Sequence, residues 1–557
     1  MYRCLVRKNS TEEIAIADFV ARITKVIYSE EGAKTYTITG NAKRGGPFTC
    51  EIDAKDFEDT GRLKGIIGAA AGALDSIHAG QREYVAPAIK AISNEVDTSK
   101  RYSRTGWAGN HFLIPGNEQP GEEVVLPTKL TYSFSPGDLN KGIEALSALI
   151  FFVGEDVAPI ILGHAFTAPL ARVAGWNDNR YGLFVRGRTG THKTSVMQCV
   201  MAIYGSGYMN RENLILWGRK FGSSVNALMG YARHASDLPL LIDNFKPYSA
   251  DDPRDLIGFI HATMEGSDKD RLDRHGNLQE AAPFRCWPCF TGEDLPDSDA
   301  AALARLLTID SRKAGNMAGL TKAQQLAAHL PAIGHAWITW LETEEGQAVV
   351  KLVAEHLPEL REEFAAKIID KAPDVKNPHR IATNLATNLI AWQVMTYHPT
   401  LGSFAMRHAE KHMTRLDALS VQIAEQTSEA AEAQQLLARL SELIAAGKVI
   451  IGDKSKTPDS RESLVGWRVS DLPGDNSQGI YLLIDAARNA VLRLSGYDLT
   501  GFSSKTLYEQ LAELGYIGTL KDPGRKTKQI RIAGTRVVTV HITAKAIFGD
   551  DEGLSEL

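Results

Sequence analysis

The sequence lacks several features that would assign a protein class at once. Its 557 residues contain five cysteines, too few for a disulfide framework in a chain of this length. The formal net charge is -5, so no general excess of positive charge attracts nucleic acid, and any such binding must come from local basic patches. The composition, with 44% hydrophobic and 23% charged residues, is that of a soluble globular protein.

Long hydrophobic runs are also lacking. The N-terminus, MYRCLVRKNSTEE, has no apolar segment long enough for a signal peptide. The most apolar stretch, residues 143–153, is followed by Glu155 and Asp156 and is too short to span a membrane. We therefore expect a cytoplasmic protein with no membrane partner.

Metal-binding patterns are equally sparse. Cys286 and Cys289 form a single CWPC without a second pair of ligands, which favours buried, unreactive thiols over a zinc or redox site. No primase or polymerase metal triad is recognisable, so any priming activity would belong to a separate primase or initiator.

The pattern of apolar residues divides a chain of this length into several domains. Strand-like runs at 35–40, 47–53 and 111–116, with one helical stretch at 61–77, predict a β-rich N-terminal domain. Further on, strand-like and helical runs alternate, which is typical of a parallel α/β layer, and a long helical stretch follows. The predicted domains are 1–134, 135–318, 319–435 and 436–557.

The segment GRTGTHKTS (187–195) approaches the phosphate-binding pattern G-x-x-x-x-G-K-[ST]. A strand-like run precedes it and an apolar helical face follows it. In that context, backbone N–H groups and the helix N-terminus cradle phosphates. Lys193 supplies positive charge to the β- and γ-phosphates, and the Thr194 hydroxyl holds Mg²⁺. The predicted nucleotide-binding residues are Gly187, Thr189, Gly190, Thr191, His192, Lys193, Thr194 and Ser195.

One position departs from the pattern, because His192 stands where glycine precedes the lysine. An alternative interpretation is a Gly/Thr-rich turn with an incidental Lys-Thr pair. A second motif favours the nucleotide site, since LPLLIDNF (238–245) is an apolar run with Asp243 near its end. A carboxylate at the tip of a buried strand is costly unless it is paired, and Mg²⁺ held by Thr194 would be its partner. The other possibility is that Asp243 caps the following turn.

Asn244 occupies the place where a catalytic glutamate is expected. Asparagine cannot act as a general base, although it can orient an attacking water. Glu293 is one candidate substitute, and a residue of a neighbouring subunit is another. Thr291 ends a third strand-like run, where its hydroxyl is placed to contact the γ-phosphate or the water.

Arg305 lies in SDAAALARLLTID (298–310), an otherwise apolar passage from a helix into a strand. An arginine there either extends along the surface to solvent or projects into the nucleotide site of another subunit. The sequence leaves both possibilities open.

These motifs together resemble those of the ring-forming AAA+ ATPases, specifically the branch with the minichromosome-maintenance helicases, in which the glycine before the lysine is also replaced. The chain is more similar to the unknown-function-domain ATPases of phages, plasmids and cassette-chromosome elements. The shared motifs, in order, are RYSRTGWAGNHFLIPG, GRTGTHKTS, LLIDNFKP and TGEDLP. The resemblance covers roughly residues 15–450.

The apolar patterns predict a mixed α+β N-terminal domain, and the pattern of the last residues predicts a C-terminal winged-helix domain at about 500–545. The resemblance implies that the fold is α/β, with an AAA+ P-loop ATPase core and a helical lid. It also implies the role of each catalytic residue. Lys193 and Thr194 correspond to Walker A, Asp243 to Walker B, Thr291 to sensor 1 and Arg305 to an arginine finger that acts on a neighbouring subunit.

Arg380, in NPHRIATNLATNLIAW (377–392), stands where the resemblance places a sensor-2 arginine at a helix start. Alternatively, it is a surface residue of a lid helix. His192 and Asn244 depart from the strictest pattern. These departures bear on the rate of ATP hydrolysis more than on nucleotide binding.

Two basic segments are candidates for DNA binding. Residues 266–285 suit a hairpin, and in helicases of the resembled class a hairpin before sensor 1 grips the DNA backbone in the ring channel. Phosphate contacts of this kind provide affinity for DNA that does not depend on its sequence. The candidate residues are Lys269, Arg271 and Arg274, and the alternative is a solvated loop whose aspartates neutralise them.

The second segment, 502–542, predicts a capped helix, a glycine turn and a hairpin with a basic loop, as in a winged-helix module. Such wings contact phosphate, while the helix lies in or near the major groove. The candidate DNA-binding residues here are Lys521, Arg525, Lys526 and Lys528. A winged helix that docks onto protein is the alternative.

We therefore expect an ATP-driven, ring-forming DNA helicase or replication ATPase of a mobile element. It would form a hexamer, use ATP with Mg²⁺ bound by Thr194 and Asp243, and act on single-stranded or forked DNA. Two other functions remain open. One is a nucleotide-dependent DNA-binding, regulatory or loader protein with little hydrolysis, and the other is a remodeller of polypeptides.

Overall fold

The computed structural model places most of the chain in two compact units, Met1–Ser135 and Pro136–Leu557. It describes residues 1–557 apart from 8–9, 73–76, 219–221, 246–250, 267–270, 273–277, 280–282, 294–299, 312–315, 374, 376, 427–429, 453–463, 469–478, 496–506, 509–510, 513–514, 518–526, 533–534, 544–546 and 548–557. In the described part, no helix is long and apolar enough to cross a membrane.

The first unit is built on a five-stranded sheet with the order β5-β4-β3-β6-β9. Along β3 (Phe19–Ser29) buried and exposed side chains alternate at first, so one face of the sheet packs on a core that includes Phe57 and Ile67. The other elements of this unit are β1 (Tyr2–Arg7), β2 (Ser10–Ala15), β4 (Lys34–Ala42), β5 (Gly46–Asp53), α1 (Ala54–Glu58), α2 (Thr60–Ala70), the 3-10 turn η1 (Arg82–Tyr84), α3 (Val85–Ala91), β6 (Asp97–Tyr102), β7 (Gly106–Ala108), β8 (His111–Leu113) and β9 (Glu122–Val124).

The three predicted strands and the predicted helix of this unit are present, but their first and last residues differ from the prediction. Strands β4 and β5 contain both predicted strands, and β8 forms the first half of the third. Helix α2 begins at a cap in which the Asp59 carboxylate accepts from the N–H groups of Gly61 and Arg62. It ends at Ala70, short of the predicted residue 77, because Gly72 has a φ of 66° and such a left-handed residue stops a helix.

The second unit contains a five-stranded sheet with the order β11-β12-β15-β10-β16, in which every neighbouring pair is parallel. This confirms the parallel α/β layer. The strands read as nearly continuous apolar runs because both faces are covered, as is usual in parallel sheets. They are β10 (Gly182–Arg186), β11 (Ile215–Leu216), β12 (Pro239–Phe245), β15 (Trp287–Gly292) and β16 (Leu306–Asp310).

The parallel arrangement brings the carboxyl ends of β10, β12 and β15 to one edge of the sheet, where ligands bind in open α/β folds. The thiols of the CWPC lie within or beside β15, and both cysteines are buried. Burial raises the pKa of the Cys286 thiol to about 12, so it stays protonated and unreactive, as predicted.

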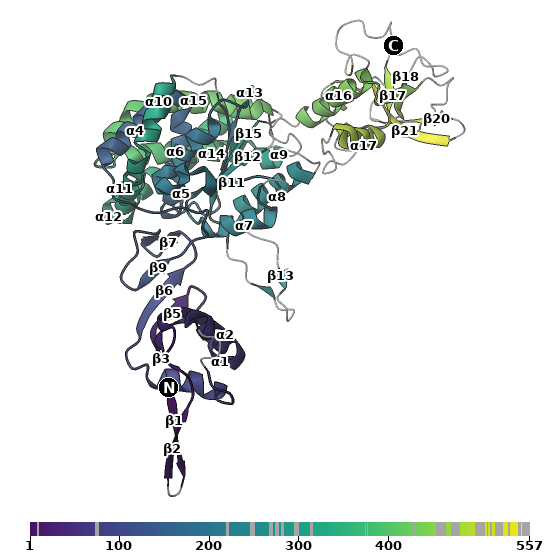
Figure 1. Ribbon diagram of the computed structural model, residues 1–557. Helices are drawn as coiled ribbons and strands as arrows, with labels where there is room; N and C mark the ends of the chain where they lie inside the picture. Colours follow the sequence, from purple (N-terminus) through teal and green to yellow (C-terminus); the bar gives the residue numbers. More distant parts are fainter. Residues whose placement is uncertain are drawn as a thin grey trace. The chain divides into compact units, whose positions relative to one another are not determined.

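Helices surround this sheet, as the teal and green ribbons of Figure 1 show. The helices that occupy most of residues 317–445 confirm the predicted helical region. The helices and 3-10 turns are α4 (Leu139–Val153), α5 (Ala158–Val173), α6 (Lys193–Met201), η2 (Ala202–Tyr204), η3 (Ser206–Met209), η4 (Arg211–Asn213), α7 (Val225–His234), α8 (Asp251–Glu265), α9 (Ala300–Leu303), α10 (Met317–Gln325), η5 (Ala327–His329), α11 (Pro331–Glu342), α12 (Glu344–Ala354), α13 (Leu357–Lys371), α14 (Pro378–Thr396), α15 (Gly402–Gln426) and α16 (Ala430–Ala445).

Buried hydrogen bonds centred on Asn388 of α14 join the helices to the sheet. Its amide nitrogen donates to the Ile160 carbonyl of α5 (3.0 Å) and to the Tyr181 hydroxyl beside β10 (2.8 Å). Its amide oxygen lies 2.8 Å from Nε2 of His412. Burial lowers the pKa of His412 to about 3, so its ring is neutral near pH 7 and Nε2 donates to the amide oxygen.

The C-terminal residues form another five-stranded sheet, β17-β18-β19-β21-β20, which shares a core with α16 and α17 (Ile484–Ser495). Leu507 and Leu511 of the predicted winged-helix segment are buried in this core. The strands are β17 (Ile450–Gly452), β18 (Leu464–Arg468), β19 (Ile480–Leu482), β20 (Lys528–Ile532) and β21 (Thr535–Ile542).

The described hairpin of the last two strands has its connection at a different place from the predicted basic loop. Strands β20 and β21 pair from Lys528 to Ile532, so the residues that connect them are Ala533 and Gly534 and not the segment around Pro523-Gly524. Lys528 therefore begins a strand, while Lys521, Arg525 and Lys526 lie outside the described residues.

Candidate nucleotide-binding site

The GRTGTHKTS segment links the carboxyl end of β10 to the start of α6, as predicted for a phosphate loop. Neighbouring strands hold its two ends. The Gly187 N–H donates to the carbonyl of Gly292 at the end of β15 (3.0 Å), and the Ser311 hydroxyl after β16 donates to the Thr191 carbonyl (3.3 Å). The loop is thus fixed at the edge of the sheet where β10, β12 and β15 end.

His192, the unexpected residue of the motif, directly precedes α6 and has a φ of 58°. Glycine is the usual residue in this left-handed region, but histidine is found there more often than most side chains. Its ring makes an edge contact with Phe152 of α4, with 6.0 Å between ring centroids. The loop therefore keeps a glycine-like backbone with a histidine in place.

The Asp243 carboxylate connects the loop to two strands. Its Oδ1 accepts hydrogen bonds from the hydroxyls of Thr194 (2.8 Å) and Thr291 (2.5 Å), so these three predicted site residues lie together. Asp243 is only 4% exposed. Both hydroxyls compensate the cost of burying the carboxylate.

Thr194 and Asp243 supply the kind of oxygen ligands that Mg²⁺ takes at phosphoryl-transfer sites. Mg²⁺ there is typically held by one or two carboxylates and the substrate phosphates, with water completing the shell. A hydroxyl and a carboxylate at hydrogen-bond distance, beside a phosphate loop, fit that requirement. In the described part of the chain, no group of three or more His, Cys, Asp or Glu residues is arranged for a metal, so a metal here would share its ligands with phosphate.

Asn244, which follows Asp243, has a backbone conformation that suits asparagine better than glutamate. Its φ is 61°, and the pairing of β12 with β15 shifts register between Ile242 and Phe245. Asparagine adopts this left-handed conformation readily, whereas for other L-residues it costs about 1–2 kcal/mol. The Asn244 N–H donates to the Thr291 hydroxyl (2.9 Å), which holds the irregular strand end in place.

The Lys193 ammonium is folded back onto the loop. Nζ donates to the carbonyls of Gly187 (2.5 Å) and Arg188 (3.1 Å). Burial lowers the pKa of Lys193, while the negative charges of Glu293 and Asp243 act in the opposite direction. A phosphate in the loop would add negative charge and favour the protonated form further.

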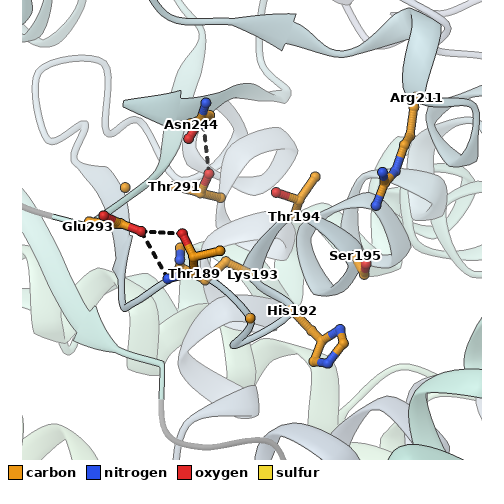
Figure 2. Close-up of a pocket in the computed structure, with 11 residues that line it drawn as sticks. Thr189, His192, Lys193, Thr194, Ser195, Arg211, Asn244, Thr291 and Glu293 are labelled. Atoms are coloured by element: carbon orange, nitrogen blue, oxygen red, sulfur yellow. Dashed lines mark hydrogen bonds between the residues drawn. The ribbon is translucent and has the colours of Figure 1, made fainter. Parts of the chain in front are cut away.

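Glu293 lies on the other side of the same loop. Its Oε1 accepts from the N–H of Thr189 (2.9 Å) and from the hydroxyl of the same residue. The carboxylate therefore lines the same cleft as Asn244, from the residue that follows β15 (Figure 2).

These side chains surround one cleft of about 270 Å³. Figure 2 shows them converging from the loop, β12, β15 and a 3-10 turn. Arg211 of that turn was not predicted, because no local sequence pattern distinguishes it. The residues that line the cleft are Thr189, Gly190, His192, Lys193, Thr194, Ser195, Arg211, Asn244, Thr291, Gly292 and Glu293.

Arg305 and Arg380 do not lie in this cleft but at the opposite edge of the sheet. Arg305 immediately precedes β16, and its guanidinium donates to the Glu265 carboxylate (3.0 Å) and to the Ala301 carbonyl (2.7 Å). Arg380, in the first turn of α14, donates to the carbonyl of Arg180 (3.1 Å), which stands two residues before β10.

Three arginines thus gather at the amino-terminal edge. Burial lowers the pKa of Arg380, and the positive charges of Arg305 and Arg180 act in the same direction. Because β10 has five residues at about 3.3 Å each, roughly 16 Å separates this edge from the phosphate loop. That separation keeps Arg305 and Arg380 out of the cleft of their own chain.

The predicted basic hairpin exists as a backbone feature. Strand β13 (Arg271–Leu272) pairs antiparallel with β14 (Leu278–Gln279). Lys269 and Arg274 lie outside the described residues, and only the backbone of Arg271 is described, so their contact with DNA stays a prediction.

Comparison with known proteins finds one matching family model and several solved structures of similar fold. A family model for a domain of unknown function, DUF927, matches residues 69–282, which include the phosphate loop and Asp243 but less than half of the chain. No curated protein matches. The fold is similar to that of a solved structure described as "SCCmec type IV Cch - active helicase", at 14% identity and a TM-score of 0.60, over 95% of this chain and 94% of the other.

A second solved structure, the apo C-terminal region of NrS-1, matches over 93% of this chain and 95% of the other, at 10% identity and a TM-score of 0.31. The likeness to the first structure is one of fold: it extends over nearly the whole length of both chains. The chain is therefore a mixed α/β protein with the architecture of that helicase.

The left-handed backbone at His192 leads to a test with two substitutions. We expect His192→Gly to leave the first turn of α6 within about 1 kcal/mol of the wild-type stability, because glycine adopts this φ without strain. His192→Val should destabilise the turn by about 1–2 kcal/mol, because β-branched residues avoid it. Hydrogen exchange over residues 187–201 measures both. If hydrogen exchange in the valine variant were as slow as in wild type, strain of a β-branched residue at this φ would be contradicted.

Proposed function

We propose that the protein is an ATP-dependent DNA helicase or replication ATPase of the AAA+ class. It assembles as a ring, hydrolyses ATP between subunits and moves along DNA. The observation that carries the proposal is the hydrogen-bonded set of Thr194, Asp243 and Thr291 directly behind the phosphate loop. The fold shared with a solved active helicase supports it.

In this proposal each residue of the cleft has a separate task. The loop N–H groups and the start of α6 bind the phosphates, and Lys193 leaves its loop carbonyls to contact them. Thr194 and Asp243 would hold Mg²⁺, which would supply positive charge to the phosphates. Thr291 orients Asp243 through its hydroxyl and stands near the attacking water.

Glu293 is the residue best placed to take the proton of that water. Asn244 is unable to accept it, but its side-chain amide can hold the water in position. The Thr189 N–H and hydroxyl fix the Glu293 carboxylate at the rim of the cleft, beside the place where the γ-phosphate would lie.

Arg305 would act on the neighbouring subunit, because it lies at the edge of the sheet opposite its own cleft. Arg180 and Arg380 would accompany it, since all three guanidiniums gather at that edge. A phosphate of the neighbour's nucleotide would relieve the repulsion between them. A hairpin at 271–279 and the basic C-terminal segment would bind the DNA backbone.

A second candidate function is a nucleotide-dependent DNA-binding or loader protein that hydrolyses ATP slowly. The pair Asp243-Asn244 favours it, because a glutamate beside the metal-binding aspartate is missing. The two candidates differ in strand displacement and in the rate of hydrolysis, and not in nucleotide binding.

The function is tested by DNA-stimulated ATP hydrolysis and displacement of a strand from forked DNA. We expect wild type to show both activities and Lys193→Ala to lose about 100-fold or more of the hydrolysis, because the charge that stabilises the transferred phosphoryl group is removed. Lys371→Ala, an exposed lysine of α13, is the control. Hydrolysis without strand displacement would favour the second candidate, and absence of ATP binding would contradict both.

The role of Glu293 is tested by Glu293→Gln. The glutamine oxygen can still accept both Thr189 hydrogen bonds, so the loop should stay intact and ATP binding should change by less than about threefold. Loss of the base should slow hydrolysis by about 100- to 10,000-fold, as measured by single-turnover kinetics. Hydrolysis at the wild-type rate would show that the base is another residue or belongs to the neighbour.

The trans role of Arg305 is tested by mixing two inactive variants. Arg305→Ala should bind ATP like wild type but not hydrolyse it, and Lys193→Ala should fail to hydrolyse. In a one-to-one mixture about a quarter of the interfaces combine an intact Lys193 with an intact neighbouring Arg305, so part of the ATPase activity should return.

Glu265→Ala is the matched control, because it breaks the ion pair of Arg305 without removing the guanidinium. Equal loss of activity in both variants would point to a structural effect. Loss of ATP binding by the dilute Arg305→Ala chain would contradict a role on the neighbour.

A further inference from the structure

Arg211 is a cation of the cleft that belongs to no recognised motif. It lies in η4, and its guanidinium extends toward Thr194 and Ser195 at the start of α6 (Figure 2). Lys193 is bonded to two loop carbonyls, whereas the Arg211 side chain has no hydrogen bond or ion pair among the described residues. It is thus a cation in the cleft that can bind a ligand without breaking a contact.

The turn that carries Arg211 is attached to the helix of the phosphate loop. Gln198 of α6 is 4% exposed, and its amide donates to the carbonyls of Tyr208 (2.8 Å) and Met209 (3.3 Å). The Asn213 amide donates to the Gly207 carbonyl (2.8 Å). These bonds fix the backbone next to Arg211 relative to the same helix N-terminus that faces the cleft.

The negative charges at the cleft favour a second cation. Glu293 lines a site that would receive a highly charged phosphate chain, and the Asp243 carboxylate lies directly behind Thr194 and Thr291 of the lining. Lys193 and the helix N-terminus offset part of this negative charge. A guanidinium stays charged in proteins and offers paired donors that match phosphate oxygens, so Arg211 supplies what the site lacks.

We propose that Arg211 binds the phosphates of the nucleotide held by its own chain, so that they lie between Arg211 and Lys193. This inference rests on the proposed function, in that the cleft must bind a nucleoside triphosphate. It assigns Arg211 a role distinct from that of Arg305: Arg211 acts within the chain and affects binding, whereas Arg305 acts on the neighbour and affects hydrolysis.

A calorimetric titration of the dilute full-length chain with ATP and Mg²⁺ tests the assignment. We expect Arg211→Ala to raise the Kd for ATP by about 10- to 100-fold, as for other hydrogen bonds between charged groups. Arg211→Lys should fall between wild type and Arg211→Ala, because it keeps the charge but loses the planar pair of donors. Glu212→Ala, on the same turn but outside the cleft, is the matched control and should bind within about twofold of wild type.

The outcomes separate this inference from the proposed function. If wild type binds ATP and Arg211→Ala binds equally well, the role of Arg211 is overturned while the function stands. If wild type does not bind ATP, both are overturned. Weak binding by Glu212→Ala as well would show that the turn, and not the guanidinium, matters, which also overturns the role.

A mixing experiment tests whether Arg211 acts in its own chain. Arg211→Ala mixed with Lys193→Ala should regain no ATPase activity at subsaturating ATP, because no cleft in the mixture holds both residues from one chain. Activity recovered to the level of the Arg305→Ala and Lys193→Ala mixture would show that Arg211 reaches the neighbour's nucleotide and would overturn the assignment.

Discussion

The Asp243 carboxylate is the contact on which the arrangement of the cleft depends. A buried carboxylate without partners would destabilise the sheet edge by several kcal/mol, and the hydroxyls of Thr194 and Thr291 remove that cost. Each hydroxyl comes from a different element, so the same bonds hold the start of α6 and the end of β15 against β12. A stabilising contact and a candidate metal site therefore coincide in the same atoms.

Two residues in left-handed conformation, His192 and Asn244, border this contact. Both stand where the sequence departs from the pattern of a phosphate-binding ATPase, and both belong to the residue types that tolerate a positive φ. The departures therefore keep the backbone geometry and change only the side chains. At Asn244 the strand end is irregular and carries no carboxylate, and Glu293 is the carboxylate that lines the same cleft.

The parallel sheet also explains why the charged residues form two groups. Its carboxyl edge collects the phosphate loop, Asp243, Thr291 and Arg211, while its amino edge collects Arg180, Arg305 and Arg380. Strands of five to seven residues keep the groups too far apart to act on one ligand in one chain. A ring in which one edge meets the other on the next subunit would unite them, and this is the physical basis of the proposed assembly.

The amino-acid sequence by itself determined the strand, loop and helix around GRTGTHKTS, the strands that carry Asp243 and Thr291 near their ends, and the helical region after the sheet. These could be predicted because apolar periodicity and short-range motifs are local properties. Details that depend on strand pairing were less accessible. The loop of the C-terminal hairpin was predicted around Pro523-Gly524, whereas β20 and β21 are connected by Ala533 and Gly534, because contacts between strands and not a local motif set the pairing.

Only the tertiary structure decided which residues share a cleft. Arg211 joins Lys193 because Gln198 and Asn213 hold a 3-10 turn beside α6, and no spacing in the sequence encodes that contact. Arg305 and Arg380 are excluded because parallel strands send their two ends to opposite edges. Local patterns specify the elements, whereas the order and direction of strands, set by long-range packing, specify which side chains meet.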